Sequence, residues 1–97
     1  MFCLICLDKL ESRHIRHANR TAHLAYLDAS PEAVCAGPLV DEDGETMIGS
    51  MILLDVPDRY TAEMWNAQDP YTRAGLFAWI EIHPWKHLYG SVPPPSH

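Results

Sequence analysis

The order of hydrophobic patterns in this chain predicts an α+β domain, with one four-stranded antiparallel sheet and two helices on one of its faces. Three observations support this prediction. Apolar segments of strand length alternate with two segments of helical period in the order βαββαβ. A proline follows the end of each helical segment, at Pro31 and Pro70. An acidic turn that ends at Gly44 separates the second and third strands and is typical of a hairpin.

The first half of the chain contains a strand, a helix and a further strand. Residues 2–7 are apolar at every position, which indicates a strand covered on both faces. From residue 11 or 12 to residue 29, small and apolar residues recur every three or four positions, and Ser12 is placed to cap this helix. The second strand spans residues 33–40, where Gly37-Pro38 favours a bulge or an edge strand because proline donates no backbone hydrogen bond.

The second half contains a strand, a helix and a last strand. The third strand spans about residues 47–56, and a helix capped by Asp58 follows it and ends at Asp69. The side chains expected on the buried face of this helix are Tyr60, Met64 and Trp65. A loop over residues 71–75 then leads to the fourth strand at residues 76–82. This order is a split βαβ arrangement, so we expect a ferredoxin-like fold.

Length, net charge and cysteine count limit the number of domains and the kinds of partner that this chain can have. The 97 residues suffice for one domain, which we expect over residues 1–91, followed by a proline-rich tail at residues 92–97. Thirteen acidic and seven basic side chains give a net charge of −6, which disfavours nucleic acid as a partner. No stretch has the length and hydrophobicity of a membrane span, so no membrane partner is expected. The three cysteines are an odd number, so we expect free thiols and a cytoplasmic location.

The predicted sheet has more apolar surface than two helices can cover. Residues 2–7, 51–54 and 76–80 are apolar on both strand faces, with Phe77 and Trp79 expected on the same face of the last strand. The same face of a second copy is the simplest cover for the open side of such a sheet. We therefore expect a homodimer that packs sheet on sheet, from which higher oligomers can assemble.

A stripe of three polar side chains and one leucine runs along one side of the first helix. Its members are spaced at i, i+4, i+7 and i+11, and are Arg16, Arg20, His23 and Leu27. From spacing alone, a solvated basic stripe is the simpler interpretation. However, His23 lies within an apolar stretch, which indicates a partly buried imidazole that needs a hydrogen-bond partner. Asp69 is the leading candidate for that partner, although its position before a proline also fits a simple turn residue.

Two other groups of residues have the spacing of functional motifs, but a structural role explains them better. Cys3 and Cys6 have the spacing of a redox or zinc motif, but residues three apart on a strand point to opposite faces. His14 and His17 are one helical turn apart and lack a third ligand, so we expect a solvated face there. No metal and no other cofactor is therefore expected.

Six short segments distributed over nearly the whole chain match a known pattern. They are residues 20–27 in the first helix, 36–39 in the second strand, Gly49-Ser50, Asp69-Pro70-Tyr71, 74–77 and 82–85. In this order and spacing they resemble the YciI-like proteins of the dimeric α+β barrel superfamily. The resemblance implies a His–Asp pair beside the sheet, at His23 and Asp69, with an arginine three residues before the histidine, at Arg20.

The resemblance also implies a small-molecule site. One branch of the family has dehydrochlorinase or lyase-type activity on hydroxylated aromatic compounds, and a sister family isomerises muconolactone. We hypothesise that His23 is a general base or acid oriented by Asp69, because an imidazole with a pKa of ~6.5 transfers protons near neutrality. The reaction would be an isomerisation, an elimination or a dehydrochlorination. Arg20 is expected to hold an anionic or phenolate substrate, while Ser50 and the backbone near Gly37 supply neutral hydrogen bonds.

Two alternatives to this enzyme hypothesis remain open at the level of sequence. A non-catalytic ligand-binding or accessory module would use the same dimeric cleft. A haem- or metal-handling protein is a weaker alternative, suggested by the six histidines and by haem-binding members among related barrels.

Overall fold

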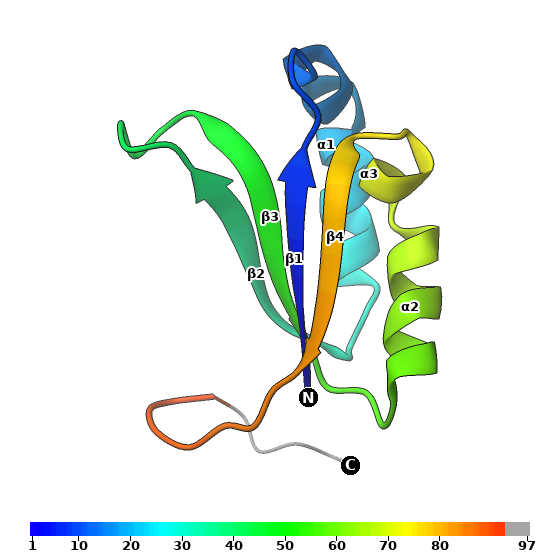
Figure 1. Ribbon diagram of the computed structural model, residues 1–97. Coiled ribbons are helices and arrows are strands. Elements are labelled where there is room, and N and C mark those ends of the chain that lie inside the picture. The colour runs from blue at the N-terminus through cyan, green and yellow to red at the C-terminus, as the bar shows by residue number, and fades with distance from the viewer. Residues whose placement is uncertain (93–97) are drawn as a thin grey trace.

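The computed structural model describes residues 1–92 and consists of a four-stranded sheet with all of its helices on one face (Figure 1). Its elements are β1 (Phe2–Asp8), α1 (Arg13–Asp28), β2 (Ala33–Val40), β3 (Met47–Leu54), α2 (Arg59–Gln68), α3 (Pro70–Arg73) and β4 (Phe77–Pro84). The strand order is β2-β3-β1-β4, and each neighbouring pair is antiparallel. The ferredoxin-like βαββαβ fold is therefore confirmed. Apart from Val92, the predicted tail at residues 92–97 lies outside the described residues.

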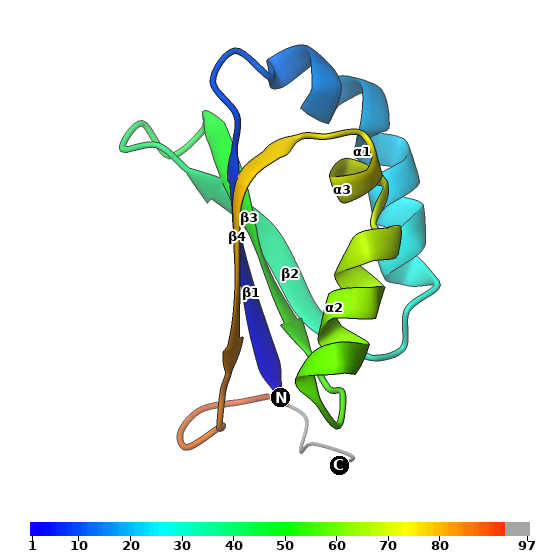
Figure 2. The ribbon, with the colours of Figure 1, turned by 45° about the vertical axis from the view of Figure 1, so that its right-hand side comes forward.

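The core lies between the sheet and the helices (Figure 2). Leu4 of β1 is paired with Ile52 of β3, and both side chains are fully buried on the helix-facing side. Cys6 and Leu54 extend this layer along the same two central strands, because alternate residues of a strand share a face. Among the described residues, no helix is long and apolar enough to cross a lipid bilayer.

Helix α1 buries two members of its stripe, as expected for His23, while Arg20 of the same stripe is exposed. Arg16 and His23 are buried, whereas the alanines that suggested a core face, such as Ala18 and Ala22, are exposed. Strand residues satisfy Arg16, and Asp69 at the junction of α2 and α3 satisfies His23. An exposed alanine leaves little apolar surface in water. Ser12 does occupy the N-cap position, but its hydroxyl donates to the Lys9 carbonyl instead of accepting from the helix.

The second helical region is two helices, not one helix and a loop. Asp58 caps α2 as predicted, by accepting a hydrogen bond from the Thr61 amide. Trp65 is buried as predicted, but Tyr60 and Met64 are exposed, since the face of α2 that meets the sheet is rotated toward residues 62 and 66. The expected loop after Asp69 contains the short helix α3, which Asp69 caps at the amide of Tyr71.

Strand β4 begins one residue later than predicted and continues to Pro84. The register to β1 shifts between Leu7 and Asp8, so that Leu7 pairs with Trp79 and Asp8 with Phe77. This bulge sends Phe77 into the core and Trp79 to the opposite face, where 57% of its surface is exposed. The prediction that both aromatic rings share a face is therefore wrong.

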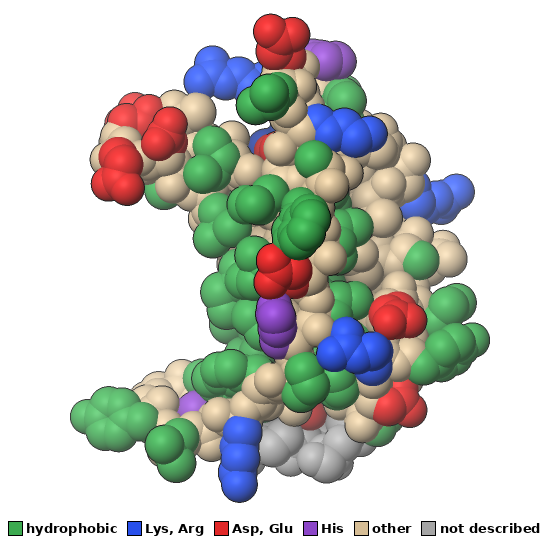
Figure 3. All heavy atoms as spheres, viewed as in Figure 1, with side chains coloured by type: hydrophobic (Ala, Val, Ile, Leu, Met, Phe, Trp, Pro, Cys, Tyr) green, Lys and Arg blue, Asp and Glu red, His purple; other side chains and the backbone are tan. Residues whose placement is uncertain are grey.

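The face of the sheet that carries no helix is predominantly apolar. Figure 3 shows hydrophobic side chains along the strands, in a hollow between the acidic β2–β3 turn and the segment after β4. The strand residues on this face include Cys3, Ile5, Leu7, Met51, Leu53 and Trp79. The apolar excess expected from the sequence is thus located on one side of the sheet.

Candidate functional site

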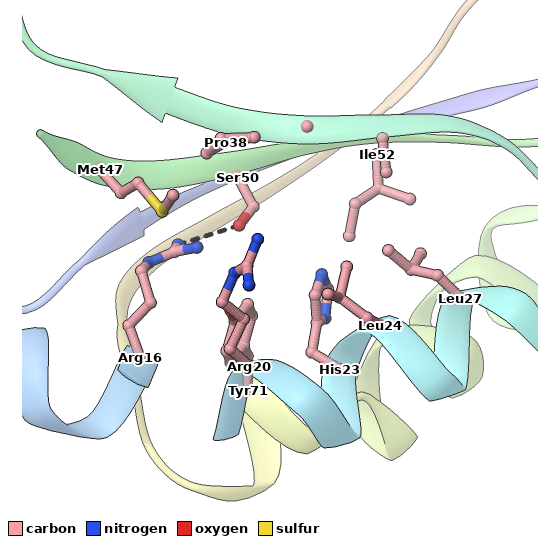
Figure 4. Close-up of a pocket in the computed structure, with 12 residues that line it drawn as sticks. Arg16, Arg20, His23, Leu24, Leu27, Pro38, Met47, Ser50, Ile52 and Tyr71 are labelled. Atoms are coloured by element: carbon pink, nitrogen blue, oxygen red, sulfur yellow. Dashed lines mark hydrogen bonds between the residues drawn. The ribbon is translucent and has the colours of Figure 1, made fainter. Parts of the chain in front are cut away.

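A cavity of about 530 Å³, including the part open to solvent, lies between α1 and the strands β2 and β3. Its lining residues are Arg16, Arg20, His23, Leu24, Leu27, Ala36, Gly37, Pro38, Met47, Ser50, Ile52 and Tyr71. Figure 4 shows the α1 side chains rising toward the two strands, with the polar groups gathered around Ser50 and the aliphatic ones around Ile52. The cavity therefore has a polar end and an apolar end.

His23 and Asp69 form a buried pair behind this cavity. The Nδ1 atom of His23 lies 2.8 Å from Oδ1 of Asp69, and the carboxylate is fully buried. The backbone amide of Tyr71 donates to the same Oδ1, at 3.0 Å. Since His23 lines the cavity while Asp69 does not, the carboxylate contacts the imidazole from the side away from the cavity. The pairing expected from the sequence is present in the geometry.

Tyr71 holds the imidazole ring in place by stacking. Its ring lies parallel to that of His23, with centroids 4.0 Å apart and an interplanar angle of 16°. The Arg16 guanidinium also lies over the Tyr71 ring, 4.7 Å from its centroid. The Tyr71 ring is therefore in contact with both Arg16 and His23. Burial raises the pKa of the Tyr71 hydroxyl, and the charge of Arg16 only partly opposes this effect.

Arg16 connects the cavity to the end of β1. Its Nε and Nη2 atoms donate to the two carboxylate oxygens of Asp8, at 2.8 and 2.9 Å, and Nη2 also donates to the Ser50 hydroxyl at 3.0 Å. Burial acts to lower the pKa of Arg16, but the bonded carboxylate of Asp8 and the nearby Tyr71 hydroxyl together outweigh it and raise the pKa above the ordinary value. Arg16 therefore stays protonated, and the Asp8 carboxylate balances its positive charge.

Four of the five residues predicted for the site line the cavity, namely Arg20, His23, Gly37 and Ser50, and the fifth, Asp69, lies behind His23. Sequence reasoning missed Asp8 and Tyr71, and it placed Arg16 in the stripe without giving it a role. A signal for Arg16 was available, because it stands two helical turns before His23 on the same side of the helix. Nothing in the pattern of β1 indicates that Asp8 is its partner.

Arg20 differs from Arg16 in its pairing. Its side chain is exposed, and it forms no hydrogen bond or ion pair with any residue that the structure describes. Its guanidinium is therefore the charge at the cavity that no carboxylate neutralises. A ligand with one negative charge would complement it.

One buried thiol lies near the acidic groups of the site. Cys6 is buried near Asp69 and Asp8, and burial together with these two negative charges raises the pKa of its thiol to about 12. Cys6 is therefore a protonated core residue. Within residues 1–92, no cluster of three or more histidine, cysteine, aspartate or glutamate side chains is arranged to hold a metal ion.

Comparison with known proteins places the chain in a family. A family model described as a YCII-related domain matches residues 1–86. The chain belongs to the YCII-related domain family. An uncharacterised member from Haemophilus influenzae is 29% identical over 84% of this chain and 89% of its own length. Protein YciI of Escherichia coli is 26% identical over 92% of this chain and 99% of its own length.

A solved structure of the same fold is also similar. It is the 5-chloro-2-hydroxyhydroquinone dehydrochlorinase of Burkholderia phenoliruptrix, in complex with 2,5-dihydroxybenzoquinone. The two chains superpose with a TM-score of 0.79 and are 32% identical, over 90% of this YCII-related chain and 95% of the dehydrochlorinase. This YCII-related protein is therefore similar in sequence and fold to an enzyme that acts on a small hydroxylated ring.

Proposed function

We propose that this YCII-related protein is a cofactor-independent enzyme that transfers a proton on a small anionic or hydroxylated molecule. The observation that carries the proposal is the buried His23–Asp69 pair, whose imidazole lines a cavity beside the unneutralised guanidinium of Arg20. The similarity to a dehydrochlorinase bound to a dihydroxybenzoquinone supports the same substrate class.

His23 is the group that moves the proton in this proposal. A carboxylate accepts hydrogen bonds, so Nδ1 of a neutral His23 carries its hydrogen toward Asp69, and Nε2 presents a lone pair. Nε2 takes a proton from an acidic O–H or C–H of the substrate, and Asp69 stabilises the resulting imidazolium. The electron pair left on the substrate then expels a leaving group such as chloride, or the proton returns at another atom. These two outcomes are elimination and isomerisation.

Three residues bind the substrate in this scheme. Arg20 supplies the positive charge for a carboxylate or phenolate oxygen. Ser50 accepts a hydrogen bond from Arg16, so its own hydroxyl hydrogen is available to stabilise an oxygen that becomes negative during the reaction. Gly37 keeps the strand backbone accessible, because no atom lies within 4 Å of the position that a Cβ would occupy.

The test uses the substrate named for the similar enzyme. Chloride release from 5-chloro-2-hydroxyhydroquinone is measured for the wild type, His23→Asn, Asp69→Asn and a control, His14→Asn, an exposed histidine of the same helix that does not line the cavity. We expect both variants of the pair to lower kcat at least about a hundredfold and the control to match the wild type. Deuterium exchange at the acidic carbon of phenylpyruvate provides a second reaction that needs no leaving group.

Equal rates for His23→Asn and the folded wild type in either reaction would overturn the catalytic role. If the wild type catalyses neither reaction yet binds 2,5-dihydroxybenzoquinone, the alternative of a non-catalytic ligand-binding or accessory module would be favoured. That alternative has one structural argument, since Asp69 also caps α3 and so contributes to the fold.

We also propose that two copies of the protein associate through the open face of the sheet. Leu7 and Met51 are 40% and 36% exposed there beside the more exposed Trp79, and a second copy would remove this apolar surface from water. Light scattering should give the mass of two chains, and Met51→Lys should shift it toward one. The free cysteines support a reducing compartment, and we propose the cytoplasm.

A further inference from the structure

A second cavity of about 550 Å³, including its open part, adjoins the first one at the start of α1. Its walls are Arg13, Arg16, His17, Arg20, Thr46 and Met47. We propose that this outer cavity binds a second anionic group of the substrate, a carboxylate or a phosphate. The proposal rests on the proposed function, because it extends the substrate from the site at His23.

The charges of α1 are arranged against the helix dipole. The N-terminal end of a helix is its positive end, where acidic side chains are favourable, yet the first turn of α1 contains none. Instead, Arg13, Arg16 and Arg20 follow one another three and four residues apart, a spacing at which like charges repel, and His17 lies next to Arg16. The first acidic residue of the helix is Asp28, at its last position. An anion in the outer cavity would offset this unfavourable concentration of positive charge.

Most of that charge is not neutralised within the protein. Of the three arginines, only Arg16 is bonded to a carboxylate. The side chains of Arg13, His17 and Arg20 form no hydrogen bond or ion pair with the residues that the structure describes. In a chain with a net charge of −6, three of the five arginines thus line one cavity.

The acidic β2–β3 turn faces the same region and confines the anion to the helix side. Hydrogen bonds from Thr46 and from the backbone amide of Glu45 lower the pKa of Asp43 to about 2, and the charge of Arg13 adds to this effect. The Asp43 carboxylate is therefore already satisfied by its own turn. It repels an anion placed near the turn and leaves His17 and Arg20 as the preferred contacts.

The spacing of the two cavities defines the substrate class. Both are lined by Arg16, Arg20 and Met47, so a ligand can extend from one into the other. His17 stands six residues before His23, which corresponds to about 9 Å along the helix. The geometry fits a flat hydroxylated or enolic group at His23, joined by a chain of a few atoms to a carboxylate or phosphate at His17.

Two probes that differ by one carboxylate test this assignment. Calorimetry measures the dissociation constants of 4-hydroxycinnamate and of 4-vinylphenol, which lacks the carboxylate, for the full chain. We expect 4-hydroxycinnamate to bind at least about tenfold tighter, as one charged hydrogen bond would produce. In the double variant Arg13→Gln/His17→Gln this ratio should fall, because the contact at His17 is lost while the one at Arg20 remains. Neither substituted side chain lines the inner cavity, so the affinity for 4-vinylphenol should not change. Arg73→Gln, an exposed arginine of α3 that lines neither cavity, is the control.

A second measurement examines the outer cavity alone. Titration with acetate and, separately, with inorganic phosphate should shift the backbone amide NMR signals of residues 13–20, and the stronger ligand identifies the preferred anion. The double variant should show smaller shifts at the same anion concentration. If both phenols bind equally and neither anion shifts these signals, the second subsite is refuted while the proposed function stands. If neither phenol binds but the anions shift the signals, the anion site is supported and the proposed function fails.

Discussion

Arg16→Met removes the charged end of a buried side chain and keeps most of its hydrocarbon stem. In the wild type, the guanidinium makes two hydrogen bonds to Asp8 and one to Ser50, and both charged side chains are only 8% exposed. The variant therefore leaves the Asp8 carboxylate buried without its counter-charge. The cost comes from this stranded charge more than from the lost contacts.

We expect Arg16→Met to lower the free energy of unfolding by about 3 kcal/mol, the lower end for a broken buried ion pair, because Asp8 retains a small exposed area. Asp8→Leu combined with Arg16→Met removes both charges and should recover the unfolding free energy to within about 1 kcal/mol of the wild type. The neighbour of Asp8 across the sheet is Phe77, which offers an apolar contact to the new leucine.

Urea unfolding followed by circular dichroism measures these values, with the denaturant slope checked for two-state behaviour. The result is read as a double-mutant cycle. A loss below about 1 kcal/mol for Arg16→Met would place the pair among solvent-screened surface ion pairs. A double variant no more stable than Arg16→Met would show that the stranded carboxylate is not the cause. Either result would refute the reasoning.

Two further predictions concern the sheet. Gly49→Ala places a Cβ 2.3 Å from the Cys6 carbonyl oxygen, so the free energy of unfolding should fall by about 1–3 kcal/mol. Gly37→Ala places its Cβ in open space, so its free energy of unfolding should stay within about 0.5 kcal/mol of the wild type. Equal effects of the two variants in urea unfolding would contradict this. Burial raises the pKa of the Cys6 thiol from 9.0 to about 12, so between these pH values the native state binds more protons than the unfolded state. The wild type should therefore lose up to about 1.4 kcal/mol of stability per pH unit as the pH rises through this window, relative to Cys6→Ala. Parallel pH profiles for the two proteins would exclude this linkage.

The fold follows from local patterns that depend on few long-range contacts. The apolar run at residues 2–7 and the hairpin turn before β3 predict the strands, and Asp58 predicts the start of α2. The errors arise where tertiary contacts override the pattern. Tyr60 has the helical spacing of a buried residue but is exposed. The bulge opposite Leu7 puts Phe77 and Trp79 on opposite faces of the sheet. A bulge is a property of strand pairing, so the alternation within one strand does not reveal it.

The candidate site was predictable in part, and mainly through a family resemblance. The apolar neighbours of His23 indicate a buried imidazole that needs a partner, but its pairing with Asp69 joins residues 46 positions apart. The spacing of residues along the chain does not show which distant residues come into contact in the fold. Asp8 and Tyr71 could not be recognised, because their roles arise from contacts with Arg16 that form when α1 is placed on the sheet.

The residue pattern alone establishes the βαββαβ order, the hairpin and the apolar excess, because these are consequences of side-chain periodicity and of turn residues with restricted backbone angles. It leaves open which face of α1 is buried. That choice depends on the polar groups opposite the helix: Asp8, Ser50 and Asp69 satisfy Arg16 and His23 in the interior, while the alanines of α1 lose little in water. A stripe that looks solvated in the sequence thereby becomes one wall of the cavity.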